Sequence, residues 1–254
     1  MSPVARLASY HTMLSLAAKL DLEAHHLDIE TAFLNGLLDK EIYMKAPNGF
    51  DGNSSVWRLC KSLYGLKQAS HIWNKLLNST LKRLGFNHCE KDTCIYLHQS
   101  KGTFVILAVH VDNMLIVSNS TKKLVKLKDG LVEHFKIKDL GEVNFLLGIE
   151  VACDRKAGTI ELSQQVYIEQ LLKRLNLQDA RPATMPLSSG VQLTQANCPS
   201  TDEEREDMTN VPYASLIGAL MYAAIGTGPD IAFAVGALSR FLSNPRRRHW
   251  NEAK

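Results

Sequence analysis

Hydrophobic and polar positions alternate along this chain in two ways, one typical of strands and one typical of helices. Residues 103–118 contain two short runs of mostly Val, Ile and Leu, separated by the turn-prone pair Asp112 and Asn113. This pattern predicts a buried β-hairpin over residues 104–117. Asp112 would then stand at the rigid tip of the hairpin and face outward, as a metal-binding carboxylate must. The alternative is that Asp112 and Asn113 only form a good turn.

Apolar residues at helical spacing predict several amphipathic helices between the strands. The helix over residues 69–84 would end at Gly85, because glycine often terminates helices. Residues 144–151 and 158–162 read as paired strands. We therefore expect an α+β fold. The predicted helices cover residues 7–20, 69–84, 124–135, 167–175, 213–224 and 229–242.

The composition changes over residues 181–210, where Pro, Ser, Thr and Gln are frequent. Such a segment predicts a long flexible linker. We therefore expect three parts: residues 1–180, the linker, and a helical segment over residues 211–254.

Asp28 is a second acidic residue beside an apolar segment, far from Asp112 in the sequence. Two carboxylates that come from distant positions, each at the end of a strand, are what a two-metal site for phosphoryl transfer requires. Magnesium usually takes one or two protein carboxylates and completes its shell with water and substrate phosphate. Asp28 and Asp112 are therefore candidate ligands of Mg²⁺ or Mn²⁺.

Five sequence motifs occur in the order typical of copia-type retrotransposon reverse transcriptases, and the chain resembles this family over essentially its whole length. The motifs are SPVAR at 2–6, LDIETAFLNG at 27–36, SLYGLKQA at 62–69, VHVDN at 109–113 and PDIAFA at 229–234. The resemblance implies an RNA-directed DNA polymerase that transfers nucleotides to a primer 3′ end. It also implies a polymerase palm, a mixed or antiparallel sheet flanked by helices, followed by a helical thumb or connection segment.

The resemblance assigns catalytic and metal-binding roles to Asp28 and Asp112, and it reveals a departure at the hairpin. The family's hairpin reads Tyr-Val-Asp-Asp, whereas this chain has His110, Val111, Asp112 and Asn113. An amide at position 113 keeps the shape of the carboxylate but loses its charge. Metal affinity and transition-state stabilisation should both fall, and the rate of nucleotide transfer should drop by about a hundredfold.

The resemblance also implies a nucleotide pocket. Phe33 is similar to the aromatic gate that excludes the 2′-hydroxyl of ribonucleotides, and its alternative role is that of a core aromatic. Gly65 would let the backbone approach the incoming nucleotide, because it has no side chain. Tyr64 and Lys67 flank this glycine. Lys67 would face a phosphate or, alternatively, only solvent.

The strands over residues 144–151 and 158–162 resemble the hairpin that holds the primer end, which assigns primer binding to Leu147 and Gly148. An ordinary hairpin at the sheet edge is the alternative. The match starts at Ser2 and the chain stops at Lys254. We therefore expect the fingers subdomain to be largely missing and an RNase H domain to be absent.

Composition agrees with this picture but adds little to it. The 254-residue chain is 45% hydrophobic, enough for a substantial core, and its formal net charge is +3. This charge permits nucleic-acid binding without requiring it, because affinity depends on local basic patches. Two basic patches exist, either of which could be only a solvated surface. They are Lys122, Lys123, Lys126 and Lys128, and Arg246, Arg247 and Arg248.

Five cysteines without the spacing of a disulfide framework predict a reduced intracellular setting, cytoplasmic or nuclear. No signal peptide or bilayer-spanning apolar stretch is visible, so no membrane partner is expected. His88, Cys89, Cys94 and His98 form a cluster, but they lack the close cysteine pair of structural zinc sites, and zinc is the less favoured interpretation.

Two hypotheses follow. The first is a magnesium-dependent reverse transcriptase that uses a primed RNA or DNA template and deoxynucleotides, impaired by Asn113 and by truncation. The second is a non-enzymatic remnant, or a nucleic-acid-binding module that keeps the fold without the chemistry. The oligomeric state stays open.

Overall fold

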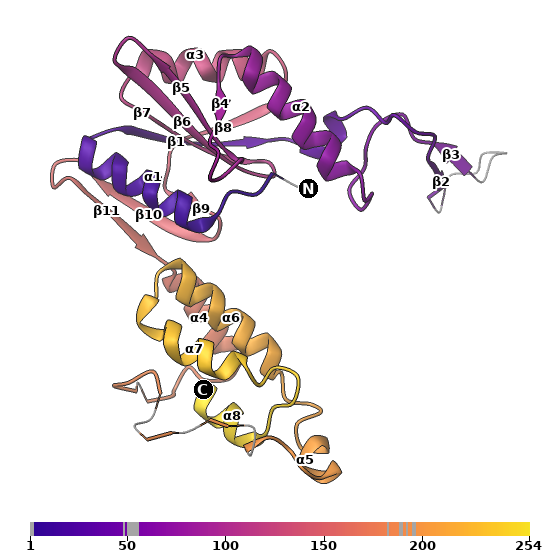
Figure 1. Cartoon of the computed structure of the whole chain (residues 1–254), viewed down its shortest axis with the longest axis vertical. Helices are drawn as coiled ribbons and strands as arrows, with labels where there is room; N and C mark the ends of the chain where they lie inside the picture. Colours follow the sequence, from indigo (N-terminus) through magenta and orange to yellow (C-terminus); the bar gives the residue numbers. More distant parts are fainter. Residues whose placement is uncertain are drawn as a thin grey trace. The chain divides into compact units, whose positions relative to one another are not determined.

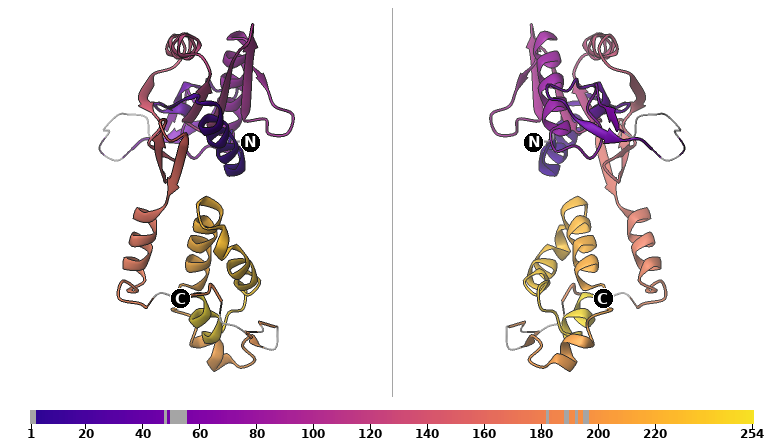
Figure 2. Two further views of the ribbon diagram at one scale, coloured as in Figure 1. Left: turned by 90° about the vertical axis from the view of Figure 1, so that its left-hand side faces the viewer. Right: turned by 90° about the vertical axis from the view of Figure 1, so that its right-hand side faces the viewer.

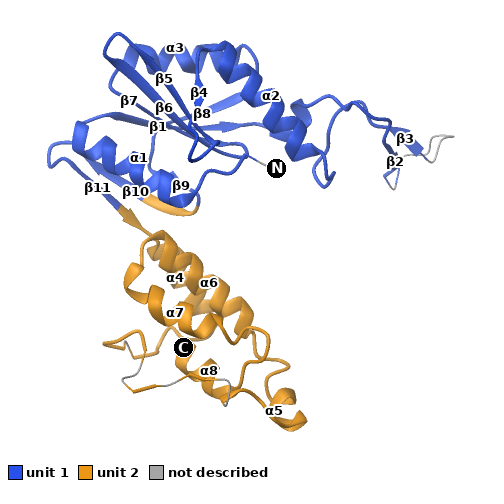
Figure 3. Cartoon of the chain, in the orientation of Figure 1, with its two compact units in different colours: residues 1–147, 151–161 blue, residues 148–150, 162–254 orange. Residues whose placement is uncertain are grey.

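A computed structural model describes residues 3–47, 49, 56–181, 183–187, 190–191, 193–194 and 197–254. The chain divides into two compact units (Figure 3). Unit 1 comprises residues 1–147 and 151–161, and unit 2 comprises residues 148–150 and 162–254. Within the described residues, no helix is long and apolar enough to cross a membrane.

Unit 1 is built on a six-stranded sheet with the strand order β4-β5-β6-β7-β1-β8 (Figure 1). Each neighbouring pair for which the register is known runs antiparallel. The sheet brings β1, early in the chain, next to β7, about ninety residues later. The strands are β1 (Glu23–Ile29), β4 (Asn87–His88), β5 (Ile95–Ser100), β6 (Thr103–His110), β7 (Asn113–Ser118) and β8 (Ile137–Glu142).

Helices cover both faces of this sheet (Figure 1). Helices α2 (Ala69–Arg83) and α3 (Thr121–Val132) pack on one face in a core that includes Trp73 and Leu131. Helix α1 (Leu7–Leu20) contacts β1, β6 and β7 from the other face. Successive residues of a strand point to opposite faces, so a central strand covered on both faces must be apolar in its middle. Its residues 114–117 are all fully buried.

Smaller elements complete unit 1. The 3-10 helix η1 (Ala32–Asn35) follows β1 directly, and its Phe33 packs against the core. A separate two-stranded sheet pairs β2 (Tyr43–Lys45) with β3 (Val56–Arg58). A three-stranded sheet has the order β11-β10-β9. Its strands are β9 (Phe145–Leu146), β10 (Ile149–Asp154) and β11 (Thr159–Ser163).

Unit 2 is helical and has its own apolar core, which includes Ile217, Leu238 and Phe241. Figure 2 shows α6 and α7 side by side, and the buried Tyr213 hydroxyl of α6 donates to Leu238 O of α7 at 2.8 Å. The helices are α4 (Gln165–Arg174), α5 (Asp202–Glu206), α6 (Tyr213–Gly226), α7 (Ala232–Ser239), α8 (Arg247–Ala253) and the 3-10 helix η3 (Pro229–Ile231).

The predicted mixture of helices and antiparallel strands is confirmed. Two details differ from expectation. In α4, Leu171 is buried whereas Ile168 and Leu172 are exposed, so the predicted apolar face is only partly covered. The segment 181–210, predicted as a linker, contains α5, and its residues 182, 188–189, 192 and 195–196 lie outside the described residues. Met1 and Ser2, the first residue of the first motif, also lie outside them.

Asp92 supplies the cap that α1 lacks within its own sequence. The helix has no side-chain cap from Arg6, the residue before it. Instead, Asp92 accepts hydrogen bonds from Arg6 N at 3.0 Å, Ser9 Oγ at 2.7 Å and Cys94 N at 3.1 Å. A carboxylate at a helix N-terminus satisfies free backbone donors and opposes the helix dipole. Asp92 therefore ties α1 to the β4–β5 connection.

We predict that Asp92→Ala lowers the free energy of unfolding by about 1–2 kcal/mol at neutral pH, the usual cost of a lost cap. Burial raises the pKa of Asp92, but the hydrogen bonds from Arg6, Ser9 and Cys94 outweigh this and lower it overall. The stabilisation is therefore complete above the ordinary aspartate pKa of about 4 and disappears as the pH falls through the lower folded value. Urea unfolding of the natural chain and of Asp92→Ala, at pH 7 and below pH 4, measures the loss of stability and its dependence on pH. Asp39→Asn, at an exposed aspartate, is the control.

Candidate active site at the hairpin turn

The hairpin turn consists of Val111 and Asp112, because His110 ends β6, Asn113 begins β7 and these two residues are Cα partners. The sequence suggested Asp112 and Asn113, so the turn lies one residue earlier than expected. Val111 has φ 61°, a left-handed conformation that is rare for a β-branched residue. Such strain persists only where the surroundings enforce it.

Two hydrogen bonds fix Val111 in this conformation. Its backbone N donates to Pro3 O at 2.6 Å, and its carbonyl accepts from the indole Nε1 of the buried Trp73 at 2.7 Å. Val4 also pairs with His110, and Ala5 N donates to Val109 O at 2.9 Å. The first motif of the chain therefore holds the turn, a role that its sequence did not reveal.

Asp28 and Asp112 come together at this turn. Asp28, on β1, is the Cα partner of Asn113, and Ile29 N donates to Asp112 O at 2.9 Å. Both carboxylates are half-buried. Burial raises the pKa of Asp28, and the negative charge of Asp112 raises it further, whereas His26 and Lys138 act in the opposite direction. The two carboxylates therefore repel each other across adjacent strands.

Asn113, the first residue of β7, links Asp112 to His26 of β1. Its Nδ2 donates to Asp112 Oδ1 at 3.0 Å, and its Oδ1 is 2.9 Å from Nε2 of His26. Because Asn113 and Asp28 are directly opposite in an antiparallel pair, their side chains share one face of the sheet.

An aromatic pair stands beside the acidic residues. The ring centroids of Phe33 and Tyr64 are 4.8 Å apart with the planes tilted by 55°. Burial raises the pKa of Tyr64, and the charges of Asp112 and Asp28 add to this, partly offset by a hydrogen bond with the Phe33 backbone. The structure thus brings together Asp28, Asp112, Phe33 and Tyr64.

Gly65 and Lys67 follow this aromatic pair. Gly65 has φ 94°, and a Cβ placed on it would meet no atom within 4 Å. Its backbone is therefore open to an approaching ligand. Lys67 is exposed, two residues before α2.

Leu147 and Gly148 form the turn between β9 and β10, with φ of 52° and 84°. Consecutive positive φ values are typical of a two-residue hairpin turn. A Cβ on Gly148 would lie 2.5 Å from the hydroxyl oxygen of Tyr222, on α6. Gly148 therefore lies close to α6, which belongs to the same unit.

Comparison with known proteins identifies the family. Residues 1–189 match the model of the family described as reverse transcriptase (RNA-dependent DNA polymerase). The chain belongs to this family. It is 44% identical to a retrovirus-related Pol polyprotein from transposon TNT 1-94 of Nicotiana tabacum, and the match covers all of this chain and 19% of the relative. It is 35% identical to a putative transposon Ty5-1 protein of Saccharomyces cerevisiae, and that match covers 90% of this chain and 73% of the relative.

The chain is similar to transposon proteins from plants and yeast, which confirms the copia-type retrotransposon assignment. It is also 34% identical to a retrovirus-related Pol polyprotein from transposon RE2 of Arabidopsis thaliana, covering all of this chain and 17% of the relative. The chain spans about a fifth of the length of the two Pol polyproteins.

The side chains at the turn fit a divalent cation. Two mutually repelling carboxylates gain from a cation between them, and Mg²⁺ needs only one or two protein carboxylates. Among the residues that the structure describes, no three His, Cys, Asp or Glu side chains gather to hold a metal. Within this described part of the chain, Asp28 and Asp112 are therefore not joined by a third such side chain, and the cysteine–histidine cluster considered for zinc does not assemble.

The basic patches of the reverse transcriptase are partly neutralised by carboxylates. At least three of the seven predicted basic side chains form ion pairs, which reduces the charge they offer to phosphates. These pairs are Lys128–Asp139, Arg246–Glu204 and Arg247–Asp207.

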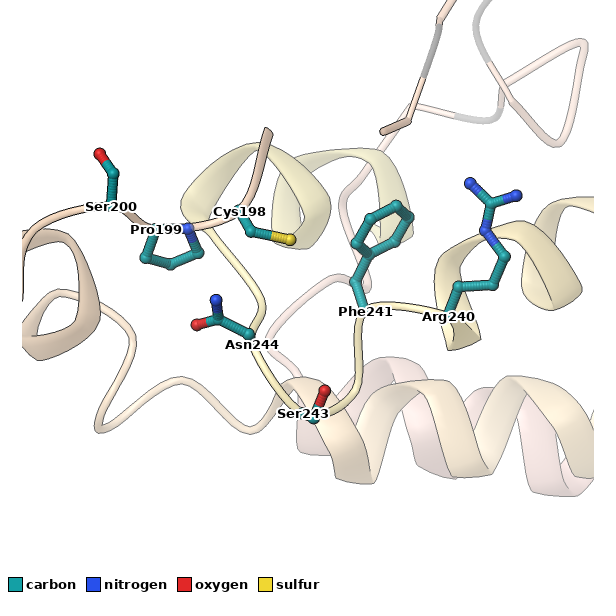
Figure 4. Close-up of a pocket in the computed structure, with 7 residues that line it drawn as sticks. All are labelled: Cys198, Pro199, Ser200, Arg240, Phe241, Ser243 and Asn244. Atoms are coloured by element: carbon teal, nitrogen blue, oxygen red, sulfur yellow. The ribbon is translucent and has the colours of Figure 1, made fainter. Parts of the chain in front are cut away.

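A cavity of about 770 Å³ lies in unit 2 and offers no carboxylate (Figure 4). Arg240, which lines it, donates to Leu193 O at 2.7 Å and lies over the Phe241 ring, 5.4 Å from its centroid. None of the residues labelled in the figure is acidic. This cavity therefore cannot take the place of the site at the hairpin turn as a magnesium site.

We predict that Gly148→Ala destabilises the reverse transcriptase by about 2 kcal/mol, because the new Cβ combines an unfavourable positive φ with a clash against Tyr222. Gly158→Ala is the matched control: its φ is 67°, but a Cβ there meets no atom within 4 Å, so it should cost only about 1 kcal/mol. Thermal unfolding of both variants measures the difference. Adding Tyr222→Phe to Gly148→Ala should restore part of the loss, and no recovery would show that the clash is unimportant.

Proposed function

We propose that this chain is the polymerase part of a copia-type reverse transcriptase and transfers deoxynucleotides to the 3′ end of a primer on an RNA or DNA template. The observation that carries the proposal is the meeting of Asp28, on β1, with Asp112, in the β6–β7 turn, beside the Phe33–Tyr64 pair. Two carboxylates beside an aromatic pair supply metal ligands and one wall of a nucleotide pocket.

Asp28 and Asp112 would hold Mg²⁺ or Mn²⁺ in this mechanism. Bound metal would neutralise the phosphates and activate the primer hydroxyl for in-line attack. The chain's own contribution is to fix both carboxylates on a rigid sheet. Trp73 and Pro3 contribute indirectly, because their bonds to Val111 set the direction of the turn.

The remaining predicted residues would bind the substrates. Phe33 would crowd the sugar, Gly65 would allow the nucleotide to approach the backbone, and Tyr64 and Lys67 would complete the pocket. Support comes from the contact between the two rings and from the open space above Gly65. Leu147 and Gly148 would contact the primer.

The architecture suits a palm with a helical thumb. Residues 1–180 would form the palm and part of the thumb, residues 181–210 a linker, and residues 211–254 a connection segment. The six-stranded antiparallel sheet, with two helices on the core face, supports the palm assignment. The separate helical core of unit 2 supports the second part.

A second function, nucleic-acid binding without catalysis, is favoured by one observation. Asn113 stands where the family has its second hairpin aspartate, so the turn provides one carboxylate instead of two. A neutral amide binds Mg²⁺ more weakly than a carboxylate. Binding of a primed template without extension would support this second function.

Primer extension with Mn²⁺ or Mg²⁺ tests the proposal. We expect slow extension by the natural chain, no extension by Asp28→Asn, and an increase of about tenfold to a hundredfold in Asn113→Asp, because a restored charge stabilises the metal-bound transition state. The substitution Asp39→Asn, at an exposed aspartate remote in sequence from both site residues, is the control. Equal rates for the natural chain and Asp28→Asn would overturn the assignment of the site.

Sugar selection tests the role of Phe33. In the Asn113→Asp variant, we predict that Phe33→Val raises ribonucleotide incorporation by about tenfold or more, because steric rejection of a hydroxyl is lost on truncation. Deoxynucleotide incorporation should change far less. Leu34→Ala, on the same 3-10 helix η1, is the control. Unchanged discrimination in steady-state incorporation assays would assign Phe33 to the core alone.

A further inference from the structure

His26 lies on the same side of β1 as Asp28, because the two residues are two positions apart in one strand. It is buried, with only 7% of its surface exposed. Its Cα partner in β7 is Leu115, so Asn113 is its diagonal neighbour. The ring reaches across this diagonal and places Nε2 at 2.9 Å from Asn113 Oδ1.

We propose that His26 is a positioning residue of the acidic site. It holds Asn113 in the one orientation in which the amide donates to the Asp112 carboxylate. The inference rests on the proposed function, because it assigns His26 a part in presenting Asp112 to a divalent cation. No motif quoted from the sequence contains His26, so the role depends on the geometry alone.

The direction of each hydrogen bond follows from the chemistry of the three groups. The Asp112 carboxylate accepts, so the Asn113 group that faces Asp112 Oδ1 at 3.0 Å is the Nδ2 donor. The amide oxygen must then face His26, and Nε2 of His26 must bear the hydrogen that it donates. A flipped amide would place oxygen against the Asp112 carboxylate and two donors against each other.

These two hydrogen bonds let Asn113 orient Asp112, although Asn113 lacks the negative charge of an aspartate. The amide engages Oδ1 of Asp112, and Oδ2 is the oxygen that would then bind a cation. Asp112 belongs to a two-residue turn, where its side chain is half-buried and lacks the constraint of a strand. Hydrogen bonds that orient a ligand carboxylate commonly change metal affinity by 10- to 100-fold when they are removed.

Binding of Mn²⁺ to the full chain, followed by the electron paramagnetic resonance signal of the free ion, tests the inference without requiring catalysis. We expect His26→Leu to weaken Mn²⁺ binding by about tenfold, in line with lost outer hydrogen bonds. His26→Gln should retain most of the affinity, because its amide can still donate to Asn113. His25→Leu is the matched control, since His25 is the preceding residue and points to the other face, toward Lys128.

The coupling between the two residues separates positioning from simple packing. In an Asn113→Ala background, His26→Leu should cause no further loss, because His26 acts through the amide. If His26→Leu does not fold, as judged by circular dichroism, Asn113→Leu makes the same test from the other residue and should also weaken binding about tenfold.

The outcomes distinguish this inference from the proposed function. If Mn²⁺ binds the natural chain no better than the double variant Asp28→Asn/Asp112→Asn, the metal site itself is wrong. If the natural chain binds Mn²⁺ and folded His26→Leu or Asn113→Leu binds it equally well, the role of His26 is overturned while the metal site stands. An equal further loss in the Asn113→Ala background would likewise overturn positioning through Asn113.

Discussion

The site depends on one constrained residue, Val111, held in a left-handed backbone conformation at the hairpin turn. A valine there costs of order 1–3 kcal/mol. The cost is offset because both of its backbone polar groups are bonded, one to Pro3 and the other to the buried Trp73 indole. Three segments distant in sequence thus meet at one residue. A tight two-residue turn is the result, and it places Asp112 beside Asp28.

The electrostatics of the site follow from that turn. Burial raises the pKa of Asp28, and the negative charge of the nearby Asp112, poorly screened on this half-buried surface, raises it further. A fold retains such a pair when something compensates for the repulsion, and a divalent cation does so directly. The Asn113 amide compensates for part of it by donating to Asp112. The Asp112 carboxylate would therefore bind the cation while it accepts the hydrogen bond from Asn113.

Much of the fold was predictable because the hydrophobic periodicity is strong. The predicted helix over residues 7–20 has the observed bounds of α1, and the helix that begins at Ala69 ends near Gly85 as expected. The hairpin over residues 104–117 was also predicted, whereas the strand predicted over residues 144–151 is interrupted by a turn at Leu147 and Gly148. The position of the turn in the first hairpin was not predicted, because Asp-Asn is the better turn pair locally, and only pairing of Asn113 with both His110 and Asp28 moves the turn back to Val111.

The candidate site was predictable for residues within motifs and unpredictable for residues that act through space. Asp28 and Asp112 were identified from their places beside apolar segments and from the resemblance, whereas His26 lies two residues before Asp28 and carries no signal of its own. Its contact with Asn113 needs the register of β1 against β7, which a sequence does not state. That register also explains why replacing a carboxylate with an amide at position 113 has two physical consequences: a charge is lost, and a directed donor to Asp112 is gained.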